Sequence, residues 1–324
     1  MRRLALLLAG AAVWLLLAVP VFADNGPHHA GAGATPDSCA GCHRAHTGVG
    51  ANLLNQSSET ALCTSCHGDT STGSSENVMG GVAYNGTTGA LRGGGFTDAA
   101  LDVTLANSVS GNPGGTAGIA VLGTALASNS KHLVDTSGTL WGNGALGTTG
   151  AGGAVTITCT SCHDPHGNGN YRILRSTPNV TGASGIVTIA DAATHTYTTT
   201  DYWHPEDTND AAYIANVSAW CSTCHTRYLA ASGLIPERTT STDAIFTYRH
   251  RTDGAGGPTD NLSYQSPQFT PTCVQCHVAH GSNAANVGPN SQAVPWPGTT
   301  TARATDSSLL RINDRGVCQK CHKR

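Results

Sequence analysis

The hydrophobic positions of this chain are gathered in one run near its start and are sparse afterwards. The run occupies residues 4–19 and follows a positively charged beginning. Later apolar positions recur at helical spacing only briefly, which predicts one helical turn over 57–62 and helices over 209–220 and 307–317. The β-branched residues 186–189 predict a short strand. The pattern therefore predicts a coil-dominated fold with a few short helices and minimal strand.

The apolar run near the start predicts a secretory signal peptide over residues 1–23. It ends at Val21-Phe22-Ala23, a small-residue cleavage pattern, and it is short for a helix that spans a membrane. No cysteine follows the expected cut, and no later stretch is apolar for long enough to span a bilayer. We therefore expect an exported protein whose mature part, residues 24–324, has no membrane span.

The composition argues against an ordinary protein core. The 324 residues include 40 glycines but only four phenylalanines and two methionines, so the chain cannot bury much apolar side chain by itself. The formal net charge is −3 and no basic stripe is present, which excludes nucleic acid as a partner. Folding is therefore expected to depend on a bound cofactor that supplies apolar surface.

Six copies of Cys-x-x-Cys-His use all 12 cysteines of the chain. In this motif two thiols attach a c-type haem covalently, and the histidine becomes the proximal iron ligand. A zinc knuckle, a redox dithiol or a disulfide could explain one copy, but none explains a histidine after every second cysteine. The sequence therefore predicts six covalently attached haems. We number the motifs 1 to 6: Cys39, Cys42 and His43; Cys63, Cys66 and His67; Cys159, Cys162 and His163; Cys221, Cys224 and His225; Cys273, Cys276 and His277; Cys318, Cys321 and His322.

The motifs form an internal repeat. Three times an isolated upstream histidine precedes Cys-x-x-Cys-His-x-x-His, and a plain Cys-x-x-Cys-His follows. The repeat predicts three haem pairs in series, over residues 24–67, 130–225 and 248–322. Together they make one hexahaem cytochrome domain over 24–324, wrapped around its haems.

Histidine is the expected ligand on the second side of each iron. Fifteen histidines less six proximal ones leave nine for six positions, whereas the mature chain has Met79 as its one methionine. A histidine three residues after the proximal one cannot return to the same iron, so it should reach a neighbouring haem. His28 and His204 remain alternatives for the sixth position, and Asp164 could orient a proximal histidine. The distal candidates are His29, His46, His132, His166, His250 and His280.

Several segments resemble one family of cytochromes when they are taken in order. They are Cys-His-Arg-Ala-His at 42–46, Ser-Cys-His-Asp-Pro-His at 161–166 with Tyr171-Arg172 after it, Trp220-Cys221, Cys-His-Val-Ala-His at 276–280, and Cys-Gln-Lys-Cys-His at 318–322. This order resembles the OmcS-type outer-surface hexahaem cytochromes of metal-reducing bacteria, although the loops differ and this chain is shorter. The resemblance implies bis-histidine haems stacked in a line and polymerisation into conductive extracellular filaments. It also implies that His46 is donated to haem 5 of the next subunit.

The expected function is long-range extracellular electron transfer, without catalytic residues. The resemblance implies further copies of the chain, other cytochromes and extracellular acceptors such as metal oxides as partners. A monomeric periplasmic electron shuttle is one alternative. The other is a multihaem reductase of small nitrogen or sulfur oxyanions, but such enzymes usually carry one variant motif, whereas all six motifs here end in histidine.

Overall fold

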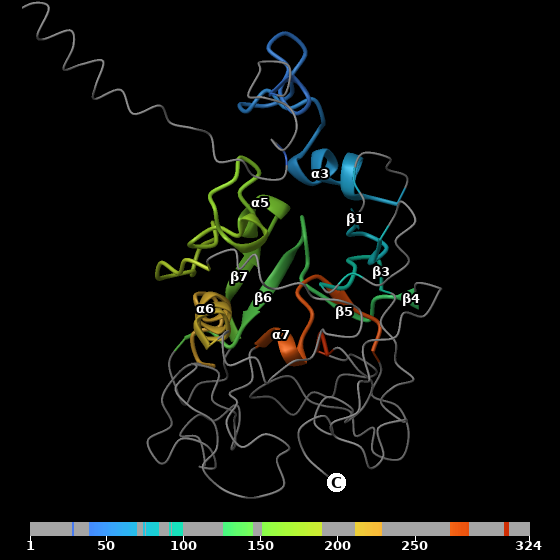
Figure 1. Ribbon diagram of the computed structural model, residues 1–324. Coiled ribbons are helices and arrows are strands. Elements are labelled where there is room, and N and C mark those ends of the chain that lie inside the picture. The colour runs from blue at the N-terminus through green and yellow to red at the C-terminus, as the bar shows by residue number, and fades with distance from the viewer. Residues whose placement is uncertain are drawn as a thin grey trace, which may run out of the picture.

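The computed structural model describes residues 28, 39–69, 74, 76–83, 91, 93–99, 126–144, 151–189, 211–228, 273–284 and 308–310. Its described helices and strands are short (Figure 1). In chain order they are α3 (Glu59–His67), β1 (Glu76–Asn77), β2 (Val82–Ala83), β3 (Asp98–Ala99), β4 (Leu126–Ala127), β5 (Ser130–Lys131), β6 (Ser137–Trp141), β7 (Ala151–Thr156), α5 (Cys159–Cys162), the 3-10 turn η1 (Tyr171–Ile173), α6 (Ala211–Ser222), α7 (Cys273–Cys276) and β8 (Gly281–Ser282).

Some sequence-based predictions lie outside the described residues. They are the signal peptide over 1–23, residues 311–317 of the last expected helix, and the site residues His29, His204, His250, Cys318, Cys321 and His322.

The strands form four separate antiparallel pairs rather than one sheet. β1 pairs with β2, β3 with β4, β5 with β8, and β6 with β7. The β5–β8 pair joins residues far apart in sequence, because Ser130 lies opposite Ser282. The β6–β7 hairpin is the longest pair, and its glycines hide the alternation of polar and apolar residues that would have predicted it.

The helices before motifs 2 and 4 are present where the sequence predicts them. Helix α3 begins after Ser58, whose hydroxyl accepts a hydrogen bond from the backbone N–H of Ala61 at 3.1 Å. The negative charge of Glu59 in the first turn stabilises the helix, because it lies near the positive end of the helix dipole. The expected single turn continues through motif 2 to His67, and α6 continues into Cys221 of motif 4.

The strand predicted over 186–189 is wrong. This segment forms no strand and has no ladder partner among the described residues. Its backbone forms isolated hydrogen bonds instead. The N–H of Val187 donates to the Ser176 carbonyl at 2.8 Å, and the Ile189 carbonyl accepts from the N–H of Tyr171 at 2.7 Å. Ile186 is 84% exposed whereas Ile189 is buried, so the β-branched run is used to anchor one side chain rather than to build a sheet.

Residues 308–310 of the helix predicted over 307–317 are not helical. Ser308 and Leu309 have positive φ angles of 53° and 62°, and Leu310 forms an isolated antiparallel bridge with His277. The apolar pair Leu309-Leu310 is therefore held against motif 5, and it does not form the face of a helix at this point.

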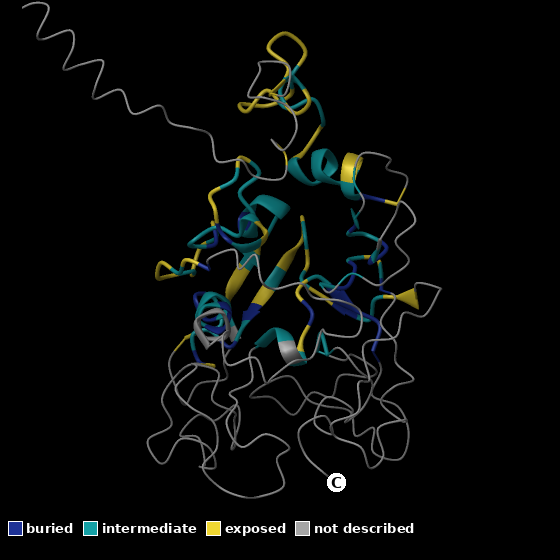
Figure 2. Cartoon of the chain, viewed as in Figure 1, coloured by how far each residue is buried: buried dark blue, intermediate teal, exposed yellow. Residues whose placement is uncertain are grey.

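The described protein core is small. The apolar cluster consists of Ala99 and Val278, with Leu309 packed against it. Figure 2 shows that most of the described residues are half-buried or exposed. Such a core supplies little apolar burial within the described residues. The buried apolar residues among those described are Ala99, Leu140, Ile189, Val217, Val278 and Ala284.

The described elements extend along one direction, which follows the order of the motifs. Helix α3 lies toward one end, α5 and the β6–β7 hairpin lie between, and α6 and α7 lie toward the other end (Figure 1). In the part of the chain that the structure describes, none of these helices has the length and apolar character required to cross a membrane.

Candidate haem sites

The proximal histidine of each described motif is oriented by a backbone carbonyl. In all five motifs the Nδ1 atom lies within hydrogen-bond distance of a carbonyl oxygen. The Nδ1–oxygen distances are 2.7 Å from His43 to Asn52, 3.3 Å from His67 to Glu76, 2.9 Å from His163 to Arg172, 2.6 Å from His225 to Trp141 and 2.9 Å from His277 to Ser308.

These contacts fix the protonation of each ring. A carbonyl oxygen only accepts hydrogen bonds, so Nδ1 must carry the proton and donate it. The neutral ring then has its lone pair on Nε2, the form in which a histidine binds a metal. The five rings therefore fit the role of iron ligands.

Four of these five proximal histidines are each faced by a second histidine. None of the four comes from the same motif as the ring that it faces. The ring centroids are 6.2 Å apart for His43 and His166, 6.1 Å for His67 and His28, 6.5 Å for His163 and His280, and 6.3 Å for His225 and His132.

The common separation of these pairs matches two imidazoles on opposite sides of one metal ion. A metal–imidazole bond is about 2 Å and the ring centre lies about 1 Å beyond the nitrogen, so two opposed rings have centres about 6 Å apart. Rings that simply pack against each other have centroids anywhere from about 4.5 to 7 Å apart, so packing alone does not explain similar separations in all four pairs. The four pairs span only 6.1–6.5 Å although their interplanar angles run from 12° to 77°. Each pair could therefore hold one haem iron.

The facing histidines follow a rule within the repeat. The x-x-His histidines His166 and His280 face the first motif of the preceding pair, at His43 and His163. The upstream histidines His28 and His132 face the second motif of their own pair. Two of these facing residues also have oriented rings, because the Nδ1 atoms of His28 and His132 bond the carbonyls of Pro165 and Ala279 at 3.0 and 2.6 Å.

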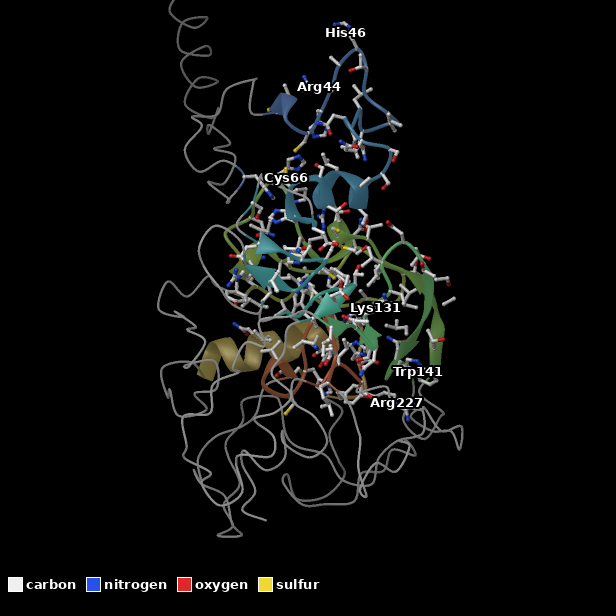
Figure 3. The ribbon with its side chains drawn as sticks, turned by 90° about the vertical axis from the view of Figure 1, so that its right-hand side faces the viewer. Arg44, His46, Cys66, Lys131, Trp141 and Arg227 are labelled. Carbon is white, nitrogen blue, oxygen red and sulfur yellow. The ribbon has the colours of Figure 1, made fainter. Side chains whose placement is uncertain are left out.

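Two predicted site residues have no such partner among the described residues. His46 is exposed and lies in a loop at the upper end of the molecule (Figure 3). His277 has its orienting carbonyl, but no second histidine ring faces it within the described part of the chain.

Asp164 does not orient a proximal histidine, and that suggestion is wrong. The Nδ1 atom of His163 bonds the Arg172 carbonyl instead. The Asp164 carboxylate accepts the backbone N–H of His166 at 3.1 Å and lies 3.7 Å from the Nδ1 atom of that ring. Its second oxygen lies 3.9 Å from the Arg175 guanidinium. Asp164 therefore shapes the turn that presents His166.

A family model for the doubled CXXCH motif matches residues 29–72, which contain motifs 1 and 2. The match marks a multihaem c-type cytochrome-like protein. Its CXXCH motifs indicate covalently bound c-type haem and a role in electron transfer, although proteins of this class also include reductases. No curated protein and no solved structure matches the chain.

The electrostatic setting of the rings favours ligation by this cytochrome-like chain. Burial lowers the pKa of His163, His277 and His132, and it lowers the pKa of His225 and His280 to about 4. A lowered pKa keeps each ring neutral at pH 7, as a metal ligand must be.

The motif cysteines approach one another in sequence order. The thiols of Cys63 and Cys159 lie close enough to interact across motifs 2 and 3, and so do those of Cys221 and Cys273 across motifs 4 and 5. Electrostatic interactions join Cys42 to Cys66 across motifs 1 and 2, and Cys162 to Cys224 across motifs 3 and 4. Haems attached to these cysteines would follow one another in the order 1, 2, 3, 4, 5.

A turn that the sequence reasoning missed supports motifs 1, 3 and 5. The residue after each proximal histidine donates its N–H to the carbonyl of an apolar residue in the turn. The leucine that follows this apolar residue forms a β-bridge with the histidine. One or two residues of each turn have φ near +50° to +62°, which costs about 1–2 kcal/mol for a residue with a side chain. The three turns are Asn52-Leu53-Leu54, Arg172-Ile173-Leu174 and Ser308-Leu309-Leu310.

The signal for this turn was visible as a repeated apolar pair. Leu53-Leu54 and Ile173-Leu174 each follow their proximal histidine at the same spacing, whereas Leu309-Leu310 follows motif 5 much later. That difference in distance concealed the third copy, so residues 308–310 were assigned to a helix.

The loop over residues 163–166 serves three sites. His163 belongs to motif 3, His166 faces His43 of motif 1, and the Pro165 carbonyl accepts from His28, which faces His67 of motif 2. A change at motif 3 should therefore reach motifs 1 and 2 through this loop.

Proposed function

We propose that this chain is a hexahaem c-type cytochrome of the OmcS type that transfers electrons over long distances. Twelve cysteines would hold the haems, and one histidine pair would bind each iron. The observation that carries the proposal is the set of four facing histidine pairs with centroid separations of 6.1–6.5 Å. Irons with two protein ligands have no open position for substrate, which favours electron transfer over catalysis.

The order of the cysteine contacts supports a continuous path for electrons. From motif 1 to motif 5, cysteines of successive motifs interact with one another, so neighbouring haems would lie close together. The bound haems supply the redox chemistry, and the chain supplies ligands and a water-poor interior. Neutral histidines on both sides of each iron favour low-spin haems of low potential.

The proposal extends to head-to-tail assembly through His46. In the described repeat, an x-x-His histidine faces the first motif of the preceding pair. His46 is the x-x-His histidine of the first pair, so its counterpart would be motif 5 of another copy. His277 of motif 5 lacks a facing histidine among the described residues, which fits that role. Such a contact is heterologous, and it builds an open filament unless the rotation closes a ring.

The filament would lie outside the cell. The N-terminal signal pattern supports export, and the resemblance to outer-surface cytochromes supports other cytochromes and metal oxides as electron partners. By the same repeat rule His250, upstream of the last pair, would serve motif 6. His28, an alternative to the predicted His29, would serve motif 2, because its ring centroid lies 6.1 Å from that of His67.

Electron microscopy of the secreted fraction, from a host that attaches c-type haems, tests this proposal. We expect thin ordered filaments from the full chain, and discrete monomers from the His46→Ala variant with its haem content retained. Arg44→Ala is the matched control, because Arg44 is exposed in the same loop (Figure 3). Filaments that persist in His46→Ala would rule out this residue as the crossing ligand.

Monomers from the unaltered chain would favour the electron shuttle over the filament. Low-temperature EPR separates both from a reductase. We expect low-spin ferric signals throughout, and a substantial high-spin signal from fully loaded protein would contradict bis-histidine ligation and favour an open catalytic iron.

A further inference from the structure

His280 is held differently from the other facing histidines. Its Nδ1 atom is buried and has no hydrogen-bond partner among the described residues. The Gly94 backbone lies near the ring but makes no hydrogen bond of normal geometry with Nδ1. His28 and His132, by contrast, each donate to a carbonyl oxygen. Something other than a hydrogen bond must set the plane of the His280 ring.

The main chain of His280 is fixed on both sides. Its N–H donates to the Gly93 carbonyl at 2.7 Å, and its own carbonyl accepts from the N–H of His132 at 3.1 Å. The adjoining residues Gly94 and Gly281 form a parallel bridge. Because the backbone is pinned, only the two side-chain torsions remain to aim the ring.

Two neighbours restrict these torsions. The Phe96 ring stacks on His280 with centroids 4.7 Å apart and an interplanar angle of 26°. Gly93 borders the ring edge so closely that a Cβ atom there would lie 2.9 Å from Nδ1. Phe96 therefore covers one face, and the glycine backbone closes the edge where a hydrogen bond would otherwise orient the ring.

We propose that Phe96 is a positioning residue for the haem of motif 3, because its stacked ring aims His280 toward His163. The inference rests on the bis-histidine ligation proposed above and assigns a role to the long segment between motifs 2 and 3, which has no haem motif of its own. Removing the aromatic face leaves His280 free to rotate away from the iron. The iron of motif 3 then becomes open to a small neutral ligand such as carbon monoxide.

The test uses the fully loaded, full-length protein. Phe96→Ala is expected to give a high-spin ferric EPR signal from one haem and to bind about one carbon monoxide per chain when reduced. Phe96→Tyr keeps the stacking face and is expected to remain low-spin, like the unaltered protein. Gly93→Ala provides a second approach, because its Cβ pushes on Nδ1, and it should give the same signal as Phe96→Ala.

Two further variants assign the effect to one iron. His280→Ala defines the spectrum of an open motif 3, and adding Phe96→Ala to it should open no second haem. Tyr228→Ala is the matched control, since Tyr228 lies edge-on to His225 at 6.0 Å and that ring is oriented by the Trp141 carbonyl. We expect this control to stay low-spin.

The proposal is overturned if fully loaded Phe96→Ala and Gly93→Ala both stay low-spin and bind no carbon monoxide. It is also overturned if the double variant opens two haems. Failure of the underlying ligation is a separate result, because it would appear as high-spin haem or carbon monoxide binding in the unaltered protein.

Discussion

Among the five motifs that the structure describes, the first and second motifs of a pair are supported in different ways. Motifs 2 and 4 lie at the ends of helices of nine and 12 residues, α3 and α6, and take their orienting carbonyls from strands β1 and β6. Motifs 3 and 5 have helices of only four residues, α5 and α7. Together with motif 1, they depend on a turn with positive φ and on a leucine bridge to the proximal histidine.

The same division applies to the facing histidines. The second motifs that the structure describes have a facing histidine from their own pair, and motifs 1 and 3 have one from the following pair. Damage to a first motif should spread along the chain, and damage to a second motif should stay local.

The largest expected difference comes from removing one haem of each kind. Cys159→Ser/Cys162→Ser removes the haem of motif 3 and loosens the 163–166 loop, so the irons of motifs 1 and 2 also lose ligand support. Cys63→Ser/Cys66→Ser should remove the haem of motif 2 alone. We expect high-spin EPR signals from neighbouring haems only in the first variant, with haem loss measured by mass. Equal spread from both variants would contradict the division.

The strained turns offer a sharper comparison. Ile173→Gly relieves a strain of about 1–2 kcal/mol but loses a half-buried side chain of similar value, so the free energy of unfolding should change by less than about 1 kcal/mol. Ile189→Gly removes a buried side chain without relieving strain and should cost about 3 kcal/mol or more. Denaturant unfolding monitored at the haem band measures both variants. A larger loss for Ile173→Gly would show that its side chain, rather than the turn, is what matters.

The helix of motif 2 should respond to its cap. Ser58→Ala removes the bond to the Ala61 N–H and should destabilise the protein by about 1 kcal/mol. The adjacent Ser57→Ala makes the same chemical change on an exposed residue outside this cap and should have little effect. Equal denaturation midpoints for the two variants would show that α3 depends on packing rather than on its cap.

The smallest expected effect concerns the contact between motif 2 and motif 3. The Glu59 carboxylate accepts the hydroxyls of Thr158, at 2.9 Å, and Thr160, on either side of Cys159. Glu59→Gln keeps an acceptor but removes a negative charge near two haems. It should raise their potentials by no more than about 60 mV, a tenfold change in equilibrium constant for one electron. Asp98→Asn on β3 is the matched control in a redox titration, and equal shifts in both variants would exclude a local effect.

The sequence identified the chemistry better than it identified the folded arrangement. The CXXCH motifs, the cap at Ser58 and the helix before Cys221 depend on neighbouring residues, so they could be predicted. The facing pairs join residues that are far apart in sequence, more than 100 positions for His43 with His166 and for His163 with His280, and no local pattern specifies the partner. The role of Phe96 is equally non-local, because it stacks on a residue from a much later motif.

The crossing histidines also limit how such a protein can be shortened or recombined. A gene fragment that ends after motif 2 encodes a complete repeat but omits His166, the residue opposite His43. Repeat boundaries in the sequence are therefore not boundaries of independently usable modules. Lengthening or trimming this cytochrome by whole repeats would leave one iron at the junction in need of a ligand, which either a further repeat or a second molecule must provide.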